Sequence, residues 1–157
     1  MSKIDELKSI HEELLVSFEE IKKRAGEELI IDENDLDGES LRTPKLLTSW
    51  LSLLGDESLK LKMFAGIQKR YYLERWRYYL GTQTDKYYAE HGIMHTKVLK
   101  TDVQMYLDAD ELMITVKKIV DTQDQVVAFI ERSIKEISSR TFHIKSAIDW
   151  RRFQSGS

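Results

Sequence analysis

The protein has 157 residues, a formal net charge of −3, 32% charged residues, one proline and no cysteine. The length fits one domain, and the lack of cysteine excludes disulfide bonds, cysteine-based zinc sites and thiol nucleophiles. High charge with a single proline favours long helices over a β-sandwich or barrel. The N-terminus is charged from residue 3 onward and no apolar run is long enough to span a bilayer, so we expect a soluble intracellular protein.

Charge is distributed very unevenly along the chain. Residues 1–41 contain 13 Asp and Glu against 5 Lys and Arg, whereas residues 57–79 carry a net charge of +4 and residues 140–153 a net charge of +3. Two local positive fields in an acidic chain indicate an anionic partner.

The first predicted elements are an amphipathic helix and an acidic connector. Apolar residues recur at spacings of three and four over residues 3–25, which predicts a helix that Gly26 ends. Residues 27–42 are rich in Asp and Glu and are predicted to connect this helix to the next. Thr43 and Pro44 have the identities of an N-cap and a first helical residue, so the second helix is predicted to start there.

The second helical region is predicted over residues 43–80, with Gly55 either breaking or bending it. Residues 81–100 have no clean period and are predicted to form a loop. Both expectations place the positive stretch of residues 57–79 on a helix.

Residues 101–157 are predicted to form the C-terminal oligomerisation helices. A helix would start after Asp102 or Asp108 and run to about Arg140 with an apolar face wider than one partner helix covers, so we expect bundling or self-association. Residues 141–153 would form a last, short basic-aromatic helix. The expected fold is therefore all-α and elongated, with a long C-terminal amphipathic helix.

The basic-aromatic stretch of residues 57–80 sorts into two faces on a helical wheel. Four cations share one arc: Lys62, Lys69, Arg70 and Arg77. A wide apolar and aromatic face lies opposite. Trp76 falls at the edge of the basic arc, and Arg75 projects from the aromatic side.

Two interpretations fit this stretch. It is either a core helix with a solvated charged face, or a surface for single-stranded nucleic acid, on which cations contact phosphates and aromatic rings stack on bases. A second basic-aromatic cluster near the C-terminus favours the nucleic-acid surface; its cations are Arg140, Lys145, Arg151 and Arg152.

The sequence offers little for catalysis or metal binding. It has no glycine-rich phosphate loop, and the acidic run ENDLDG would place Pro44 where a calcium loop needs a bidentate carboxylate. His91 and His95 could supply two imidazoles, but no third ligand is evident. We therefore expect no enzyme activity, cofactor or metal, and a metal-dependent enzyme is a remote alternative.

The C-terminal sequence SRTFHIKSAIDWRRFQSG resembles the C-terminus of the UvsY-like recombination mediators of T-even-type phages. Collinear matches precede it: Ile31-Asp32, Leu36, Trp50-Leu51, Arg75, Tyr78-Tyr79 and Ala109-Asp110. The resemblance covers roughly residues 16–157.

This resemblance implies a non-enzymatic protein of DNA recombination, repair and replication in the cytoplasm of an infected bacterium. Such proteins bind single-stranded DNA, a phage single-strand-binding protein and a phage RecA-like recombinase, and form ring-like homo-hexamers or heptamers. The family's Lys-x-Arg DNA-binding motif places its Arg on Arg75 and its Lys on Leu73, so Arg77 or Arg70 could supply the second charge. The alternative hypothesis is a coiled-coil scaffold that binds no nucleic acid.

Overall fold

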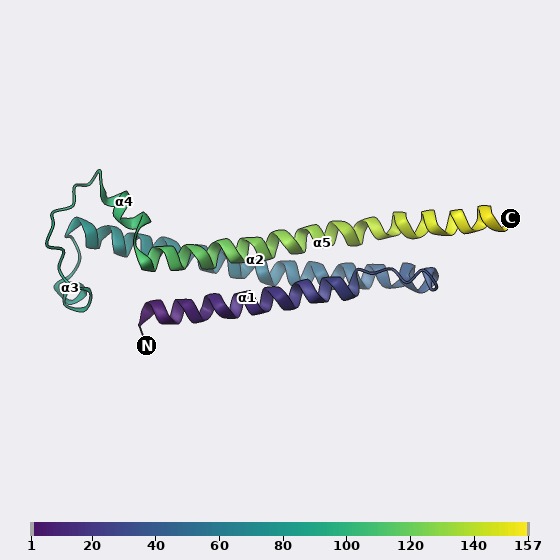
Figure 1. The fold of residues 1–157 in the computed structure, drawn as a ribbon, viewed down its shortest axis with the longest axis horizontal. Coiled ribbons are helices and arrows are strands. Elements are labelled where there is room, and N and C mark those ends of the chain that lie inside the picture. The colour runs from purple at the N-terminus through teal and green to yellow at the C-terminus, as the bar shows by residue number, and fades with distance from the viewer. Residues whose placement is uncertain (1, 157) are drawn as a thin grey trace. The chain divides into compact units, whose positions relative to one another are not determined.

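A computed structural model describes residues 2–156. In this range the chain forms helices and no strands: α1 (Lys3–Glu28), α2 (Leu36–Leu80), α3 (Asp85–His91), α4 (Val103–Asp108) and α5 (Glu111–Ser155) (Figure 1). This confirms the expected all-α class and the long C-terminal helix. None of the helices within residues 2–156 combines the length and the apolar character needed to cross a membrane.

The contacts within the chain divide it into two compact units. Unit 1 holds the residues up to Leu14 together with Leu61–Thr122, and unit 2 holds Leu15–Lys60 together with the residues from Gln123 onward. The three long helices α1, α2 and α5 each contribute a segment to both units. That residues 1–157 act as a single domain stays a prediction.

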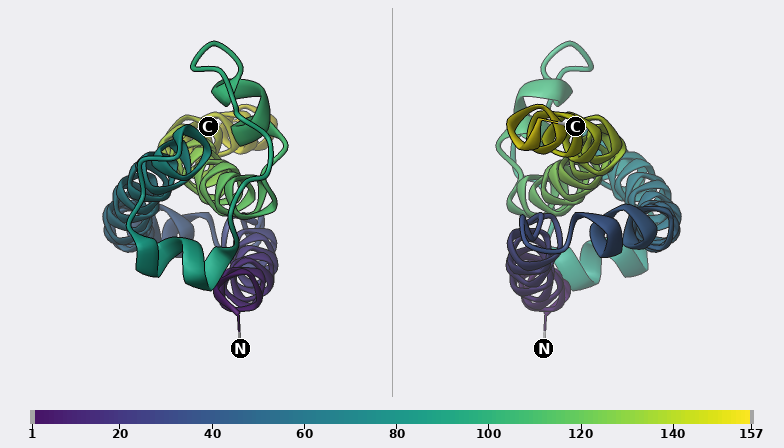
Figure 2. Two further views of the ribbon diagram at one scale, coloured as in Figure 1. Left: turned by 90° about the vertical axis from the view of Figure 1, so that its left-hand side faces the viewer. Right: turned by 90° about the vertical axis from the view of Figure 1, so that its right-hand side faces the viewer.

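Unit 1 is built around an apolar cluster between three helices. Leu7 and Leu14 of α1 pack with Val116 and Ile119 of α5, and aromatic residues of α2 cover the cluster. The left view of Figure 2 shows α3 beside the segments of α1 and α2 that belong to unit 1. The seven-residue spacing of the two leucines puts both on one face of α1, as the sequence predicted.

Unit 2 is built around Trp50 of α2, which is fully buried. Its ring packs in a cluster that includes Ile21 of α1 and Ile130 of α5. The indole Nε1 donates a hydrogen bond to Glu28 Oε2 at 3.0 Å, so the one polar atom of this large side chain is satisfied.

The predicted start of the second helix at Thr43 and the predicted connector of residues 27–42 are wrong. α1 continues past Gly26 to Glu28, and α2 already begins at Leu36. Asp35 caps α2, because its Oδ1 accepts a hydrogen bond from the backbone N–H of Gly38 at 3.1 Å. Pro44 consequently lies inside α2.

The later boundaries also differ in part from the prediction. α2 passes through Gly55 without a break and ends at Leu80, directly before Gly81, whose φ of 75° favours glycine. The predicted loop of residues 81–100 contains α3, which Thr84 caps by accepting a hydrogen bond from the backbone of Tyr87.

The C-terminal region contains one long helix where two were predicted. The long helix was predicted to start after Asp102 or Asp108, but only the short helix α4 begins after Asp102, and it ends at Asp108. The long helix α5 then starts at Glu111 and continues to Ser155, so the separate helix predicted over residues 141–153 is wrong. No glycine or proline interrupts this segment, and the helix therefore has no reason to stop.

Candidate nucleic-acid interface

The cationic face of α2, formed by Lys62, Lys69, Arg70 and Arg77, is exposed in unit 1. Among residues 2–156, none of these four side chains forms an ion pair. Their charges are therefore available to an anionic ligand such as a phosphate.

Arg70 and Arg77 also line a hollow of about 340 Å³ together with Lys3 of α1 and His91 of α3. Lys3 is tethered here, since its Nζ lies 3.5 Å from a carboxylate oxygen of Glu74. The sequence did not single out Lys3, which lies in the acidic N-terminal segment and reaches this hollow only through the packing of α1.

Trp76 lies half-buried beside the cationic face of α2. Its ring stacks on that of Tyr72, with 5.8 Å between the ring centroids and 29° between the planes. The Tyr72 hydroxyl donates to Oε1 of Gln104 at 2.9 Å. The pair offers a partly exposed aromatic surface next to exposed cations. Proteins that bind single-stranded nucleic acid use this combination.

Arg75 has a different environment from the other cations of α2. Its Nε and Nη2 lie 2.8 and 2.7 Å from Oδ2 of Asp110, the residue before α5. Its guanidinium carbon lies 4.1 Å from the ring centroid of Tyr78. Burial by itself would lower the pKa of Arg75, but the hydroxyls of Tyr87 and Tyr79 and the carboxylate of Asp110 raise it above its usual value.

Asp110 is the acceptor at the centre of this arrangement. Its Oδ1 accepts the backbone N–H of Met113 at 3.0 Å and so caps α5, while its Oδ2 also accepts the Tyr79 hydroxyl at 2.7 Å. Burial and the hydrogen bond to Asp110 raise the pKa of Tyr79. We call Arg75, Tyr79, Tyr87 and Asp110 the Arg75 cluster.

The role of Asp110 was not predicted, although one local signal in the sequence was present. An aspartate directly before a long apolar period is typical of a helix N-cap. That it also pairs with Arg75 depends on contact between α2 and the start of α5, which no local pattern reports.

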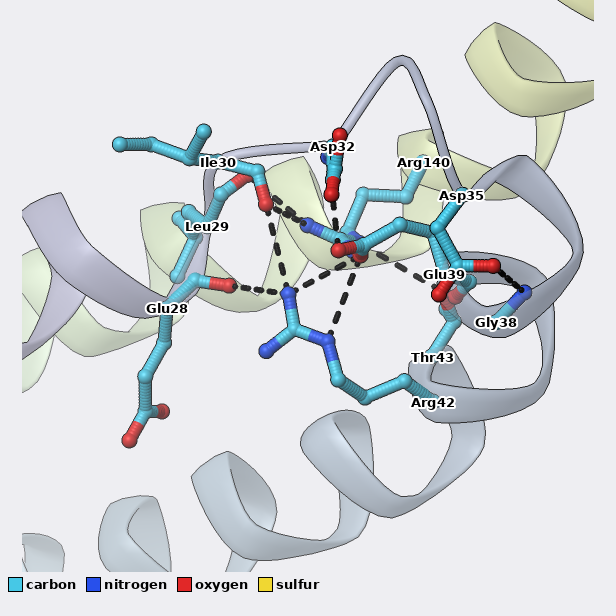
Figure 3. Close-up of polar contacts among 10 residues, drawn as sticks. All are labelled: Glu28, Leu29, Ile30, Asp32, Asp35, Gly38, Glu39, Arg42, Thr43 and Arg140. Carbon is cyan, nitrogen blue, oxygen red and sulfur yellow. Dashed lines mark hydrogen bonds and ion pairs between the residues drawn. The ribbon is translucent and has the colours of Figure 1, made fainter.

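Arg140 does not fit the predicted role of a DNA contact, because it is only 2% exposed in unit 2. Its Nη1 donates to the carbonyl oxygens of Leu29 and Ile30 at 2.9 and 3.2 Å, and its Nη2 pairs with Glu39 (Figure 3). Arg42 approaches the same carboxylate, at 3.0 Å. Arg42 also donates to the Glu28 carbonyl, so the two arginines satisfy carbonyl oxygens at the last residue of α1 and just after it. Arg140 is therefore not part of the interface.

The other predicted C-terminal cations, Lys145, Arg151 and Arg152, are exposed on α5 in unit 2. Arg151 donates to the backbone carbonyl of Glu33 in the segment between α1 and α2. Arg151 and Arg152 also line a hollow of about 410 Å³ whose other wall includes Asp35 and Asp37. Arg151 and Arg152 therefore lie near local carboxylates, as Arg70 and Arg77 do in the hollow that they share with Glu74 and Glu90.

Within residues 2–156, no group of three or more His, Cys, Asp or Glu side chains is arranged to hold a metal ion. The His91 ring stacks on Tyr87 with 4.0 Å between the ring centroids, and its Nδ1 lies 2.9 Å from the Tyr87 carbonyl oxygen. The His91 ring is thus held by its contacts with Tyr87.

Comparison with known structures identifies the same fold elsewhere. Three crystal structures of the bacteriophage T4 recombination mediator protein UvsY, in lattice types IV, II and I, superpose with TM-scores of 0.77, 0.78 and 0.77 at 20% sequence identity. The matches cover 87, 87 and 86% of this chain and 98, 96 and 98% of the UvsY chains. A search of curated protein sequences found no match.

The sequence itself also matches a known family. Residues 25–157 match the family described as "Recombination, repair and ssDNA binding protein UvsY". This match spans most of the chain and includes α2 with its cationic face, the Arg75 cluster and α5. The chain therefore belongs to the UvsY family.

Proposed function

We propose that this protein is a recombination mediator that binds single-stranded DNA through the cationic face of α2. Bound there, it helps a phage RecA-like recombinase replace a phage single-strand-binding protein, in the cytoplasm of an infected bacterium. The proposal depends on family membership and on one observation: within residues 2–156, four exposed cations on one helix face have no ion-pair partner.

The chemistry of this face favours binding without sequence selectivity. Lysine and arginine side chains contact phosphates, and the paired rings of Tyr72 and Trp76 can stack with any base. Four phosphate contacts per chain give an expected slope of log affinity against log salt of about −3. The exposed C-terminal cations Lys145, Arg151 and Arg152 form a second candidate contact region in unit 2.

A ring-like homo-hexamer or heptamer would turn this modest site into a strong one. Each subunit repeats the same patch, and a strand held by one patch meets the next at high effective concentration. No chemical step is needed for this role, and we propose no catalytic residue, cofactor or metal.

The first test measures binding of fluorescent oligo-dT by anisotropy at several salt concentrations. We expect Arg70→Ala and Arg77→Ala each to weaken binding several-fold and to reduce the salt slope by about 0.7. Lys23→Ala is the matched control, because Lys23 is exposed on the acidic helix α1 and forms no ion pair within the described chain.

Unchanged affinity in a double variant of Arg70 and Arg77, with the same particle mass as wild type, would rule out the cationic face of α2. If the wild-type protein itself binds no oligonucleotide and its tryptophan fluorescence does not respond to oligo-dT, the coiled-coil scaffold becomes the better hypothesis.

The mediator role needs a separate assay. Single-stranded DNA is first coated with the single-strand-binding protein, and the ATPase activity of the recombinase is then followed with and without this protein. Shortening of the lag before recombinase activity supports the proposal, and an unchanged lag at saturating protein contradicts it.

A further inference from the structure

Arg75 lies in the sequence between cations that are free for phosphate, yet its own donors are occupied. Two of its nitrogens contact Asp110, Nη1 lies 3.5 Å from the Tyr87 hydroxyl and Nη2 lies 3.4 Å from the Tyr79 hydroxyl. The side chain is 14% exposed. A phosphate contact requires donors that point into solvent, and Arg75 presents few of them.

The carboxylate of Asp110 gives a second reason against direct contact. Its side chain is 4% exposed, and Arg75 is its only ion-pair partner within residues 2–156. Moving the guanidinium to a phosphate would leave this buried charge without its cation, which costs more than one exposed ion pair returns. The same carboxylate would also repel a phosphate placed close to Arg75.

The contacts of Arg75 join three helices at the end of the cationic face. Arg75 and Tyr79 belong to α2, Tyr87 belongs to α3, and Asp110 caps α5. The two residues that follow Arg75 on α2 are Trp76 and Arg77, which the proposed interface uses directly.

We propose that Arg75 is a positioning residue for DNA binding: its pair with Asp110 fixes the last turns of α2 against α3 and the start of α5, and so holds Trp76 and Arg77 in place. This inference depends on the proposed function. It separates Arg75 from the phosphate-contacting cations Lys62, Lys69, Arg70 and Arg77.

Asp110→Asn distinguishes positioning from direct contact by the sign of its effect on oligo-dT affinity. The asparagine keeps the size and the capping oxygen of the side chain but removes the charge. If Arg75 contacts DNA, losing its competing carboxylate strengthens binding. If Arg75 positions its neighbours, weakening the pair lowers affinity, and we expect a loss of about three- to ten-fold.

Arg75→Lys provides the second measurement because it keeps the positive charge and loses the planar fork. We expect it also to weaken binding three- to ten-fold while leaving the salt slope as in wild type, since no phosphate contact is removed. The double variant Arg75→Lys with Asp110→Asn should bind no more weakly than the weaker single variant, because both changes break one interaction.

Circular dichroism and light scattering confirm that each variant remains helical and assembled before affinities are compared. Stronger binding by Asp110→Asn, a reduced salt slope in Arg75→Lys, or additive losses in the double variant would each overturn the proposal. Arg77→Ala in the same titrations tests the proposed function separately, since it should change the salt slope whatever the role of Arg75.

Discussion

Arg140, which is buried, and Arg75, which is largely buried, each pair with a carboxylate far away along the chain. Arg140 of α5 pairs with Glu39 of α2, and Arg75 of α2 pairs with Asp110 before α5. Buried ion pairs contribute little net stability when complete, but removing one partner leaves an uncompensated charge. Both residues are therefore sensitive positions even where they touch no DNA.

Replacing Arg140 with methionine should destabilise the protein by about 3 kcal/mol, at the lower end for a broken buried pair because Arg42 still contacts Glu39. Urea denaturation followed by circular dichroism measures this loss. Arg132→Met on the exposed side of α5 is the control and should change stability by less than about 0.5 kcal/mol. A loss below about 1 kcal/mol in Arg140→Met would show that Arg42 alone balances the carboxylate.

Glu39 should also make stability depend on pH. Burial by itself would raise the pKa of Glu39, but hydrogen bonds from Arg42 and the backbone of Asp32, together with the two nearby cations, lower it below the ordinary value of 4.5. A folded-state pKa below the unfolded value gives stabilisation that is present above about pH 4.5 and is lost as the pH falls through the folded value.

Glu39→Gln should therefore be less stable than wild type at pH 7, and the difference should shrink as the pH drops below about 4.5. Urea midpoints measured between pH 7 and pH 3 show this convergence directly. A difference that is constant over the whole range would mean that the carboxylate charge contributes nothing to folding.

At the scale of helices, glycine has opposite effects on stability at two positions of the chain. Gly66 lies within α2, and an added Cβ there would meet nothing within 4 Å beyond the helix's own backbone, whereas Gly81 follows the last residue of α2 with a φ of 75°. Glycine at position 66 destabilises the helix, because it loses more backbone conformational entropy on folding than alanine. Glycine at position 81 is favourable, because a positive φ is strained for residues that have a Cβ.

Gly66→Ala should raise stability by about 1 kcal/mol, and Gly81→Ala should lower it by a similar amount. Both variants are compared with wild type by thermal and urea denaturation. Because Gly66 is exposed on α2, loss of stability or of particle mass in Gly66→Ala would show that another subunit approaches the helix there.

At the scale of the whole molecule, one exposed aromatic pair at the C-terminal end of α5 supports self-association. Trp150 and Phe153 stack with 5.7 Å between their ring centroids, and they are 60 and 76% exposed. Large aromatic side chains in solvent indicate an interaction surface.

Light scattering of the wild type should therefore give a mass of several times the 18.5 kDa of one chain. Replacing both Trp150 and Phe153 with serine should reduce this mass. Leu41→Ser, an exposed apolar position on α2, serves as the control. An unchanged mass in the double variant would place the contact between subunits elsewhere, and a monomeric wild type at all concentrations would contradict self-association.

Local patterns in the sequence determined the helical class and the cationic face of α2, because helical periodicity depends only on residues three and four apart. They failed at the start of α2, where Thr43 and Pro44 imitate a helix start but Asp35 is the cap. Thr43 and Asp35 both have side-chain oxygens that can cap a helix N-terminus. Only the folded structure shows that Asp35 is the residue that does so.

Only the tertiary structure decided which partners Arg75 and Arg140 have. The sequence marked both as cations near aromatic residues, and by composition neither differs from Arg70 or Arg77. Their carboxylate partners lie 35 and 101 residues away along the chain, and charge patterning reports no contact at such separations. Pairing with Asp110 and Glu39 separates these two arginines from Arg70 and Arg77, which stay exposed.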